Sequence, residues 1–335
     1  MRIYLSLDDV PADFGPCALT IGNFDGVHFG HRRILRQVAA LAVARGWKSA
    51  VLTFDPHPTQ VVAPDRTPVL LTSPAHRAEL MEEEGIAEVL ILPFTAEIAR
   101  LSPEDFVRQL LVERLGVRAV LVGDNFCFGH RQSGNVRLLA ELGGKLGFET
   151  EIVPAVNWRG RMVSSSGIRA LLRAGRVSLA ARMLQHPYAL DGAVVEGRGV
   201  GSKQTVPTLN LEPDGGLVPA AGVYVTRAYD LAGGRREAGR GADCREAGRG
   251  GDRRWNAITN IGYRPTFGDS DRLTVETFLL DPFSGDTPSR IRVEFLWRVR
   301  DERKFDSPAA LKQQILRDVH LAQRYFRRAA AWTGA

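Results

Sequence analysis

Short apolar runs alternate with longer segments of helical periodicity through the first half of the 335-residue chain. The apolar runs are residues 18–22, 49–54, 88–92, 119–123 and 151–156. The segments with apolar residues at helical spacing are residues 30–45, 76–84, 103–115 and 136–146. Strands separated by helices of roughly 10–15 residues indicate βαβ units. The sequence therefore predicts an α/β domain with a parallel sheet over residues 1–185.

The pattern changes after residue 185. Short strand-like segments separated by Gly and Pro follow at residues 191–197, 222–229, 255–262, 273–280 and 290–299. Such a series is typical of a small antiparallel barrel. A last amphipathic segment, residues 308–326, predicts a terminal helix. We therefore expect a second domain over residues 186–335, with the boundary near residues 185–188.

Residues 233–254 differ from the rest of the second half. The hexapeptide REAGRG occurs twice in this segment, and almost no side chain in it is apolar. A segment with so little to bury is expected to be disordered. An Arg-rich segment can also contact RNA, but this one has no aromatic residue to stack on bases. We expect an inert expanded loop and no nucleic-acid partner.

Cysteine content, hydropathy and charge limit the class of protein further. Cys17, Cys127 and Cys244 are far apart and share no metal-ligand spacing, which disfavours a disulfide framework. No apolar run reaches the roughly 18 residues of a membrane span, and no signal-peptide core follows Met1. We expect a cytoplasmic protein without a membrane partner. The net charge of +6 favours anionic partners, among them nucleotides and phosphorylated metabolites.

The segment between the first predicted strand and the first predicted helix has the composition of an anion site. It consists of Gly22, Asn23, Phe24, Asp25, Gly26, Val27, His28, Phe29, Gly30 and His31. Its glycines allow the backbone to approach a phosphate, and the helix start offers free N–H groups and a positive dipole end. Because ligands of an open α/β sheet bind at this edge, we expect an anionic ligand here.

Two histidines of this segment are candidates for catalysis. His28 and His31 are three residues apart, so both can project from one face of the helix start. Two imidazoles there can donate hydrogen bonds to a triphosphate and stabilise the charge that develops during phosphoryl-type transfer. Surface or capping histidines and metal ligands are the alternatives, although no third metal ligand is near in sequence.

A second candidate phosphate-binding segment precedes a helical stretch at residues 169–174. It contains Ser164, Ser165, Ser166 and Arg169. Serine hydroxyls at a helix start either cap the helix or bind phosphate oxygens. The planar guanidinium of Arg169 suits the same phosphates.

Aromatic side chains gather at the ends of two predicted strands. The residues concerned are Phe54, Pro56 and His57 at the end of the second strand, and Asn125, Phe126 and Phe128 after a later one. Each phenylalanine fits a hydrophobic core as well as it fits a ligand contact. Together, the phenylalanines are suited to hold a planar ring, and Asn125 to donate a hydrogen bond near the reacting phosphates.

The segment from Gly22 to His31 resembles the HxGH nucleotidyltransferases, which transfer adenylyl groups on a Rossmann-like sheet. With TFDPHP at 53–58 and GDNFCFG at 123–129, it resembles the bacterial bifunctional riboflavin kinase/FMN adenylyltransferase family, also called FAD synthetases. The resemblance implies catalysis by His28, His31 and Asn125. It implies ATP contacts by Gly22, Phe24, Asp25, Gly26, Gly30, Ser164, Ser165, Ser166 and Arg169, and flavin contacts by Phe54, Pro56, His57, Phe126 and Phe128.

The second half contains a glycine-rich turn at residues 197–201, followed by Pro-Thr-Leu-Asn at 207–210. Thr208 and Asn210 point to the same side of an extended segment, and their oxygens suit Mg²⁺. The tetrapeptide resembles the PTAN signature of riboflavin kinases. On that resemblance Gly199 and Gly201 cover the nucleotide, and Lys203 reaches its phosphates.

Two further segments, NIGYRPTF at 260–267 and VETFLLD at 275–281, also resemble riboflavin kinases. The resemblance implies that Glu276 is the general base, which takes the proton from the 5′-hydroxyl of the ribityl chain. A solvent-facing strand residue is the alternative role for this glutamate. The chain departs from the family at Phe278, where His is frequent, and in the loop at residues 202–206.

The sequence therefore predicts an enzyme of FAD biosynthesis that uses ATP twice. Riboflavin and ATP would give FMN in the barrel, and FMN and ATP would give FAD and pyrophosphate in the sheet domain, with Mg²⁺ as cofactor. One alternative is nucleotidyl transfer to another phosphorylated metabolite, beside a degenerate flavin-binding barrel. The other is a flavin-sensing protein that contacts RNA.

Overall fold

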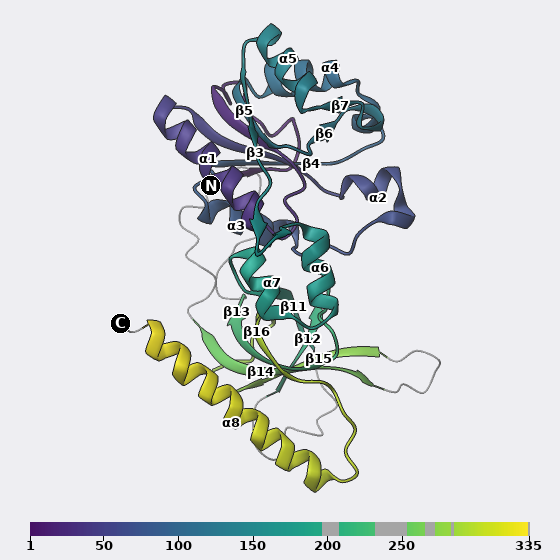
Figure 1. Cartoon of the computed structure of the whole chain (residues 1–335), viewed down its shortest axis with the longest axis vertical. Coiled ribbons are helices and arrows are strands. Elements are labelled where there is room, and N and C mark those ends of the chain that lie inside the picture. The colour runs from purple at the N-terminus through teal and green to yellow at the C-terminus, as the bar shows by residue number, and fades with distance from the viewer. Residues whose placement is uncertain (196–207, 232–252, 265–271, 283–284, 334–335) are drawn as a thin grey trace. The chain divides into compact units, whose positions relative to one another are not determined.

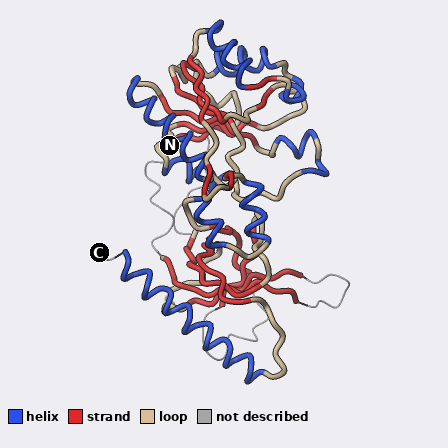
Figure 2. Tube along the Cα trace, viewed as in Figure 1, coloured by secondary structure: helices blue, strands red, loops and turns tan. Residues whose placement is uncertain are grey.

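The computed structural model describes residues 1–195, 208–231, 253–264, 272–282 and 285–333 (Figures 1 and 2). Contacts between residues divide the chain into two compact units: the first consists of residues 1–165, and the second begins at Ser166. The helices next to the barrel in sequence, α6 (Ser165–Arg173) and α7 (Val177–Leu184), are thereby grouped with it. The domain boundary near residues 185–188 stays a prediction.

The first unit is built on a parallel six-stranded sheet in the order β1-β4-β3-β2-β5-β8. Its strands are β1 (Arg2–Tyr4), β2 (Cys17–Ile21), β3 (Lys48–Phe54), β4 (Glu88–Leu92), β5 (Val117–Gly123) and β8 (Glu149–Val153). The chain runs outward from β2 to β4 and then returns to β5 on the other side of β2. The predicted parallel sheet is thus confirmed, and its strand order reverses between β2 and β5.

Helices cover both faces of this sheet (Figure 1). The helical segments are α1 (Phe29–Arg45), α2 (Pro58–Val62), η1 (Pro64–Arg66), α3 (Pro74–Glu83), η2 (Ile98–Arg100), α4 (Pro103–Asp105), η3 (Phe106–Arg114), η4 (His130–Gln132) and α5 (Val136–Leu146). Successive residues of a strand serve opposite cores: Ala18 packs with α1 and α3, whereas Leu19 packs with η3 and α5. This explains why the central strands are buried almost throughout and mostly apolar.

Two short hairpins complete the unit: β6 (Cys127–Phe128) pairs with β7 (Gly134–Asn135), and β9 (Asn157–Trp158) pairs with β10 (Arg161–Met162). A buried ion pair then fixes α1 against α3. Arg32 of α1 donates to Glu84, the residue that ends α3, and both side chains are almost fully buried. Arg36 donates to the same carboxylate. A buried carboxylate shared by two guanidiniums restricts how α1 lies, because losing a partner would leave a charge unpaired.

The second unit contains a closed antiparallel barrel in the order β11-β12-β15-β14-β13-β16. Its strands are β11 (Tyr188–Val195), β12 (Thr208–Pro213), β13 (Gly222–Asp230), β14 (Arg254–Arg264), β15 (Arg272–Leu279) and β16 (Arg290–Arg300). The first strand, β11, pairs with the last, β16, so the ring has no free edge. The predicted barrel and its terminal helix, α8 (Pro308–Thr333), are confirmed.

The barrel interior combines large aromatic rings with a chain of hydroxyls. Tyr188 and Tyr224 are fully buried and lie against the ring of Phe295. The hydroxyls of Thr226, Thr259 and Thr277 follow one another at 2.7 and 3.0 Å. On the outside, Ala322 of α8 packs on Val223, Val225 and Ile258. Alternation of interior and exterior residues therefore accounts for the period of two in these strands.

The Arg/Gly-rich segment lies in the connection between β13 and β14, which pair with each other as neighbouring strands. Residues 233–252 of it lie outside the described residues, and the expectation of disorder over 233–254 stays a prediction. Arg253 donates to the carboxylate of Asp230 at 2.6 Å, and Arg254 begins β14.

Gly192 gives the barrel a stringent packing requirement. A Cβ atom at this position would lie 2.1 Å from the carbonyl oxygen of Glu212 on β12. We expect Gly192→Ala to lower the free energy of unfolding of the barrel by about 3 kcal/mol, because the two strands must separate. Calorimetric unfolding checks this. The control, Gly144→Ala in α5, meets no atom within 4 Å and should stabilise its own unit slightly; equal effects would contradict the prediction.

Candidate active site

The loop that follows β2 lies at the point where the strand order of the parallel sheet reverses. Ligands of doubly wound sheets bind at this position. Three residues of the loop have left-handed backbone: Phe24 (φ 49°), Gly26 (φ 81°) and Val27 (φ 38°). A β-branched residue rarely adopts such a conformation, so the surrounding structure must impose it.

Asp25 anchors this loop. Its carboxylate accepts hydrogen bonds from the backbone N–H groups of Leu71 at 2.8 Å and Thr72 at 3.2 Å, and the side chain is only 3% exposed. The N–H of Gly26 donates to the hydroxyl of Thr72 at 3.1 Å. The carbonyl of Asp25 accepts a hydrogen bond from the hydroxyl of Ser165 at 2.9 Å. The predicted ATP contacts Asp25 and Ser165 are therefore brought together, with the carboxylate directed at backbone amides.

His28 is the N-cap of α1. Its Nδ1 atom accepts a hydrogen bond from the N–H of His31 at 3.4 Å, and the two rings stack with their centroids 3.6 Å apart. Gly30 leaves room for this arrangement, because a Cβ there would lie 3.2 Å from Cε1 of His28. With Nδ1 as the acceptor, the proton of the neutral ring is on Nε2. The capping role considered for a histidine here is thus combined with a fixed donor at Nε2.

Burial keeps both histidines neutral. Desolvation lowers the pKa of His28 to about 4. It lowers the pKa of His31 well below the usual value, and the nearby His28 and Arg77 lower it further. The ring of Phe24 meets His31 edge-on at 5.1 Å, and Nδ1 of His31 is buried without a hydrogen-bond partner among the described residues. The pair is therefore able to donate hydrogen bonds at neutral pH without carrying charge.

The predicted flavin-contacting phenylalanines lie in the core on the other face of the sheet. Phe54 is 8% exposed and meets Phe94 edge-on at 5.3 Å. Phe126 stacks on Phe128 at 5.5 Å, and Phe126 is half-buried. Asn125, at the end of β5, is exposed. The structure thus brings the three phenylalanines into one apolar cluster, and their contact with a flavin stays a prediction.

His57 is a second histidine that caps a helix. Its Nδ1 atom accepts a hydrogen bond from the N–H of Thr59 at 3.2 Å, at the start of α2. Its Nε2 atom lies 3.0 Å from the side-chain amide of Asn23. The atom of Asn23 that makes this contact is the amide nitrogen Nδ2. His57, which follows the predicted flavin contact Pro56, is therefore tied to the first loop.

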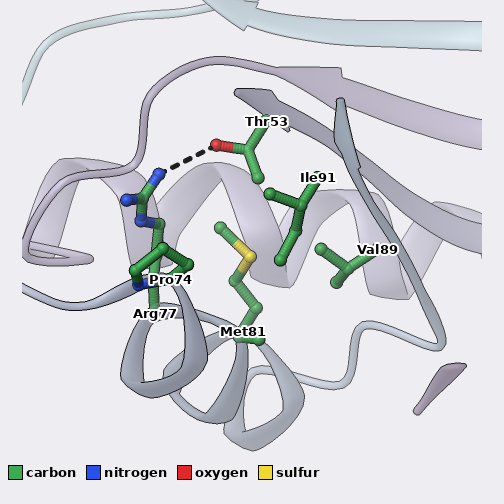
Figure 3. A pocket seen from close by; sticks show the side chains of 7 residues that line it. Thr53, Pro74, Arg77, Met81, Val89 and Ile91 are labelled. Carbon is green, nitrogen blue, oxygen red and sulfur yellow. Dashed lines mark hydrogen bonds between the residues drawn. The ribbon is translucent and has the colours of Figure 1, made fainter. Parts of the chain in front are cut away.

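Sequence reasoning missed Arg77 of α3. Its guanidinium donates to the carbonyl of Asn23 at 2.9 Å and to the hydroxyl of Thr53 at 3.2 Å, as Figure 3 shows for Thr53. The pocket in Figure 3, lined by Thr53, Pro74, Arg77, Ala78, Met81, Val89 and Ile91, does not admit even a water molecule. This pocket is therefore no ligand site. The signal that could have revealed Arg77 is its place, four residues before buried Met81, on the apolar face of α3.

The remaining phosphate-binding candidates lie around the start of α6. Ser165 is its first residue, and Ser164 precedes it. Ser166 and Arg169 belong to the second unit, where Arg169 is 7% exposed. Their contacts with ATP stay predictions.

In the barrel, polar residues of three neighbouring strands lie side by side as cross-strand partners. Asn210 of β12 lies opposite Glu276 of β15, which lies opposite Asn260 of β14. Thr208 of β12 lies opposite Phe278 of β15. The residues between these and the row above, Leu209 and Thr277, are buried, so Thr208 and Asn210 lie on the same outer face of the barrel. The structure thus brings Thr208, Asn210 and Glu276 together. The candidates Gly199, Gly201 and Lys203 lie outside the described residues.

Among the described residues, no group of three or more His, Cys, Asp or Glu side chains is arranged to hold a metal ion. None of the described helices combines the length and apolar character that crossing a bilayer requires.

Models of two protein families match consecutive parts of the chain. The FAD synthetase model matches residues 10–167, and the riboflavin kinase model matches residues 184–326. A solved structure described as a macrolide-efflux protein from Streptococcus pneumoniae has a TM-score of 0.80 at 24% identity, covering 96% of this chain and 98% of that one. At that identity, the likeness shows the fold alone.

Curated relatives share the order of both parts. The bifunctional riboflavin kinase/FMN adenylyltransferase of Pseudomonas fluorescens is 34% identical over 324 residues, 96% of this chain and 97% of the relative. The enzyme of the same description from Escherichia coli K12 is 32% identical over 310 residues, 92% and 93% of the two chains. That of Bacillus subtilis is 31% identical over 313 residues, 92% of each chain. These matches confirm the predicted resemblance: the chain belongs to the bifunctional riboflavin kinase/FMN adenylyltransferase family.

Proposed function

We propose that the first unit transfers an adenylyl group from ATP to FMN, and that the barrel phosphorylates riboflavin. The observation that carries the first assignment is the stacked, neutral His28–His31 pair at the start of α1. In this reaction a phosphate oxygen of FMN attacks the α-phosphate of ATP, and pyrophosphate leaves. Negative charge grows between the α-phosphate and the leaving group, so fixed hydrogen-bond donors at that place lower the barrier.

Each group of the first site then has a separate task. Nε2–H of His28 and the ring of His31 donate to the phosphates, supported by the free N–H groups of the first turn of α1. Gly22 and Gly26 allow the nucleotide to approach the backbone, and Asn125 reaches the reacting phosphates from β5. The apolar cluster of Phe54, Phe126 and Phe128 supports one face of the isoalloxazine ring.

Glu276 is proposed as the base of the kinase reaction. Its carboxylate takes the proton from the 5′-hydroxyl of riboflavin as that oxygen attacks the γ-phosphate of ATP. Asn210 lies directly across from it, and Thr208 is the next residue on that face of β12. Hydroxyl, amide and carboxylate oxygens are the donors that Mg²⁺ accepts, so this row fits the ion. Bound there, Mg²⁺ would neutralise charge on the ATP phosphates.

The cellular setting proposed for these reactions is the cytoplasm. ATP is the co-substrate of both steps, and both described cysteines, Cys17 and Cys127, are free thiols. The partners are the small molecules riboflavin, FMN and ATP.

The two-site proposal predicts that His28→Ala abolishes only the second reaction. FAD formation from supplied FMN should fall by about 10²–10³-fold, because the donor at the α-phosphate is lost. FMN formation from riboflavin should stay within twofold of wild type. Product chromatography measures both, with His320→Ala, an exposed histidine of α8, as the control. Loss of both activities in a folded His28 variant would contradict separate sites.

The converse variant is Glu276→Gln, which keeps the size of the side chain but cannot accept the proton. Riboflavin phosphorylation should fall by about 10²-fold or more, whereas FAD formation from FMN should be unchanged. The control is Glu294→Gln, a carboxylate on β16 that accepts a hydrogen bond from Tyr229. Kinase activity that survives in Glu276→Gln would remove the general-base role.

The adenylyl-transfer step should tolerate mild acid. The pKa of His28 is lowered to about 4 from 6.5, so the ring stays neutral from pH 8 down to about pH 5 and gains a proton only below that. Protonation places a hydrogen on Nδ1 and removes the cap of α1. We expect kcat for FAD formation, at saturating FMN and ATP, to be flat between pH 8 and pH 5 and to decline toward pH 4. Circular dichroism at each pH controls for unfolding; a decline centred near pH 6.5 would refute the neutral-donor role.

A further inference from the structure

One stretch of chain, the 71–77 segment, holds both ends of the strained loop after β2. Its first residues, Leu71 and Thr72, bind the carboxylate of Asp25 through their N–H groups. Its last residue, Arg77, donates to the carbonyl of Asn23 at 2.9 Å. The loop between β2 and His28 therefore takes its shape from α3 and the residues just before it.

Arg77 also connects two strands of the sheet. Its Nη1 atom reaches both the carbonyl of Asn23, after β2, and the hydroxyl of Thr53, in β3. Thr53 in turn donates to the same carbonyl at 3.4 Å. Arg77 is 3% exposed and Thr53 is 1% exposed, so these hydrogen bonds form out of contact with water. A buried carbonyl held by a charged donor is strongly fixed in position.

The charge of Arg77 has no contacting carboxylate among the described residues, and its buried Nε atom has no hydrogen-bond partner there. Asp25 and Asp55 act on it from a distance, and burial lowers its pKa. Positive charge is thus left at the edge of the sheet where anions bind.

The titratable groups that act on His31 are His28, its neighbour on α1, and Arg77 on α3. Each disfavours a proton on the imidazole of His31. His28 and His31 stack at 3.6 Å, so their titrations are coupled.

We propose that Arg77 is a positioning residue of the adenylyl-transfer site, which fixes the loop before His28 and presents its positive charge to His31. It acts through the histidines and the loop, without touching the reacting atoms. This inference rests on the proposed catalytic role of the two histidines. It adds a specific cause for their arrangement, located on a helix that carries none of the recognised motifs.

The test compares four variants of the intact chain, each assayed for FAD formation from FMN and for FMN formation from riboflavin. Arg77→Met removes the charge and the donors, and Arg77→Gln removes the charge but keeps an amide donor. Arg77→Lys keeps the charge and loses the planar fork. Arg66→Met removes an exposed arginine of η1 and is the matched control. The readouts are kcat and KM at pH 7.5, the pH profile of kcat, and the melting temperature.

In Arg77→Met and Arg77→Gln we expect kcat for FAD formation to fall by about tenfold or more, with KM for ATP and FMN within about twofold, because the histidines are misplaced rather than absent. The decline of kcat at acid pH should shift to a higher pH, by about half a unit or more, because a positive charge near the histidine pair is lost. Arg77→Lys should recover part of kcat and keep the acid limb of wild type. FMN formation should be unchanged in all four.

The proposal is overturned if the acid limb stays in place in both Arg77→Met and Arg77→Gln, or if Arg66→Met moves it equally. It is also overturned if FAD and FMN formation fall together with the melting temperature. If Arg77→Met does not fold, Arg77→Gln alone decides. Failure of the proposed adenylyl-transfer site would give a different result from failure of the Arg77 proposal. Wild type would then form FAD, and His28→Ala would form it at the same rate as wild type.

Discussion

The hydrogen bond from the N–H of His31 to Nδ1 of His28 is the interaction on which the first site depends. It starts α1, stacks the two imidazoles and fixes the proton of His28 on Nε2. Gly30 is required because a side chain would press on the ring that forms the cap. The ion pair between Arg32 and Glu84 sets the direction of the helix, and the 71–77 segment sets the loop before it. The proposed catalytic donor and the helix cap are thus the same side chain, so one residue serves both the local fold and the proposed chemistry.

Most of the architecture could be predicted from periodicity, because the strands of the first unit are buried on both faces and those of the barrel on one. β1 (Arg2–Tyr4) escaped prediction because three residues of mixed polarity carry no period, and pairing with β4 alone makes them a strand. α7 (Val177–Leu184) escaped because its eight residues are too few to show a helical stripe; it forms by packing on the barrel, where Ser178 donates to the carbonyl of Leu296. In both cases long-range contacts, which local sequence does not contain, decide the structure.

The residues of the candidate site also divide into those that the local sequence predicts and those that only long-range contacts place there. Residues adjacent in sequence, such as Gly30 and His31, could be assigned from spacing, because the loop and the helix start place them together. The partners of Arg77 could not, since they are a carbonyl in the loop after β2 and a hydroxyl of β3, both far from α3 in sequence. Asp25 shows the limit of motif reasoning: within the motif predicted to bind phosphate, its carboxylate is directed at backbone amides rather than at solvent. Phe278 likewise packs at the edge of the core beneath α8, where no local pattern would place it.

Closure of the barrel has a consequence for how the chain is made. Asp191 of β11 and Arg292 of β16, joined by an ion pair at 2.6 Å, are separated by 101 positions in the chain. The last strand of the parallel sheet, β8, ends at Val153. The first unit can therefore fold on the ribosome while the last strand of the barrel has not yet been synthesised. At roughly 5–20 residues per second, β11 waits about 5–20 seconds for its partner. During that interval its edge is unpaired, and the nascent chain is then most dependent on chaperones.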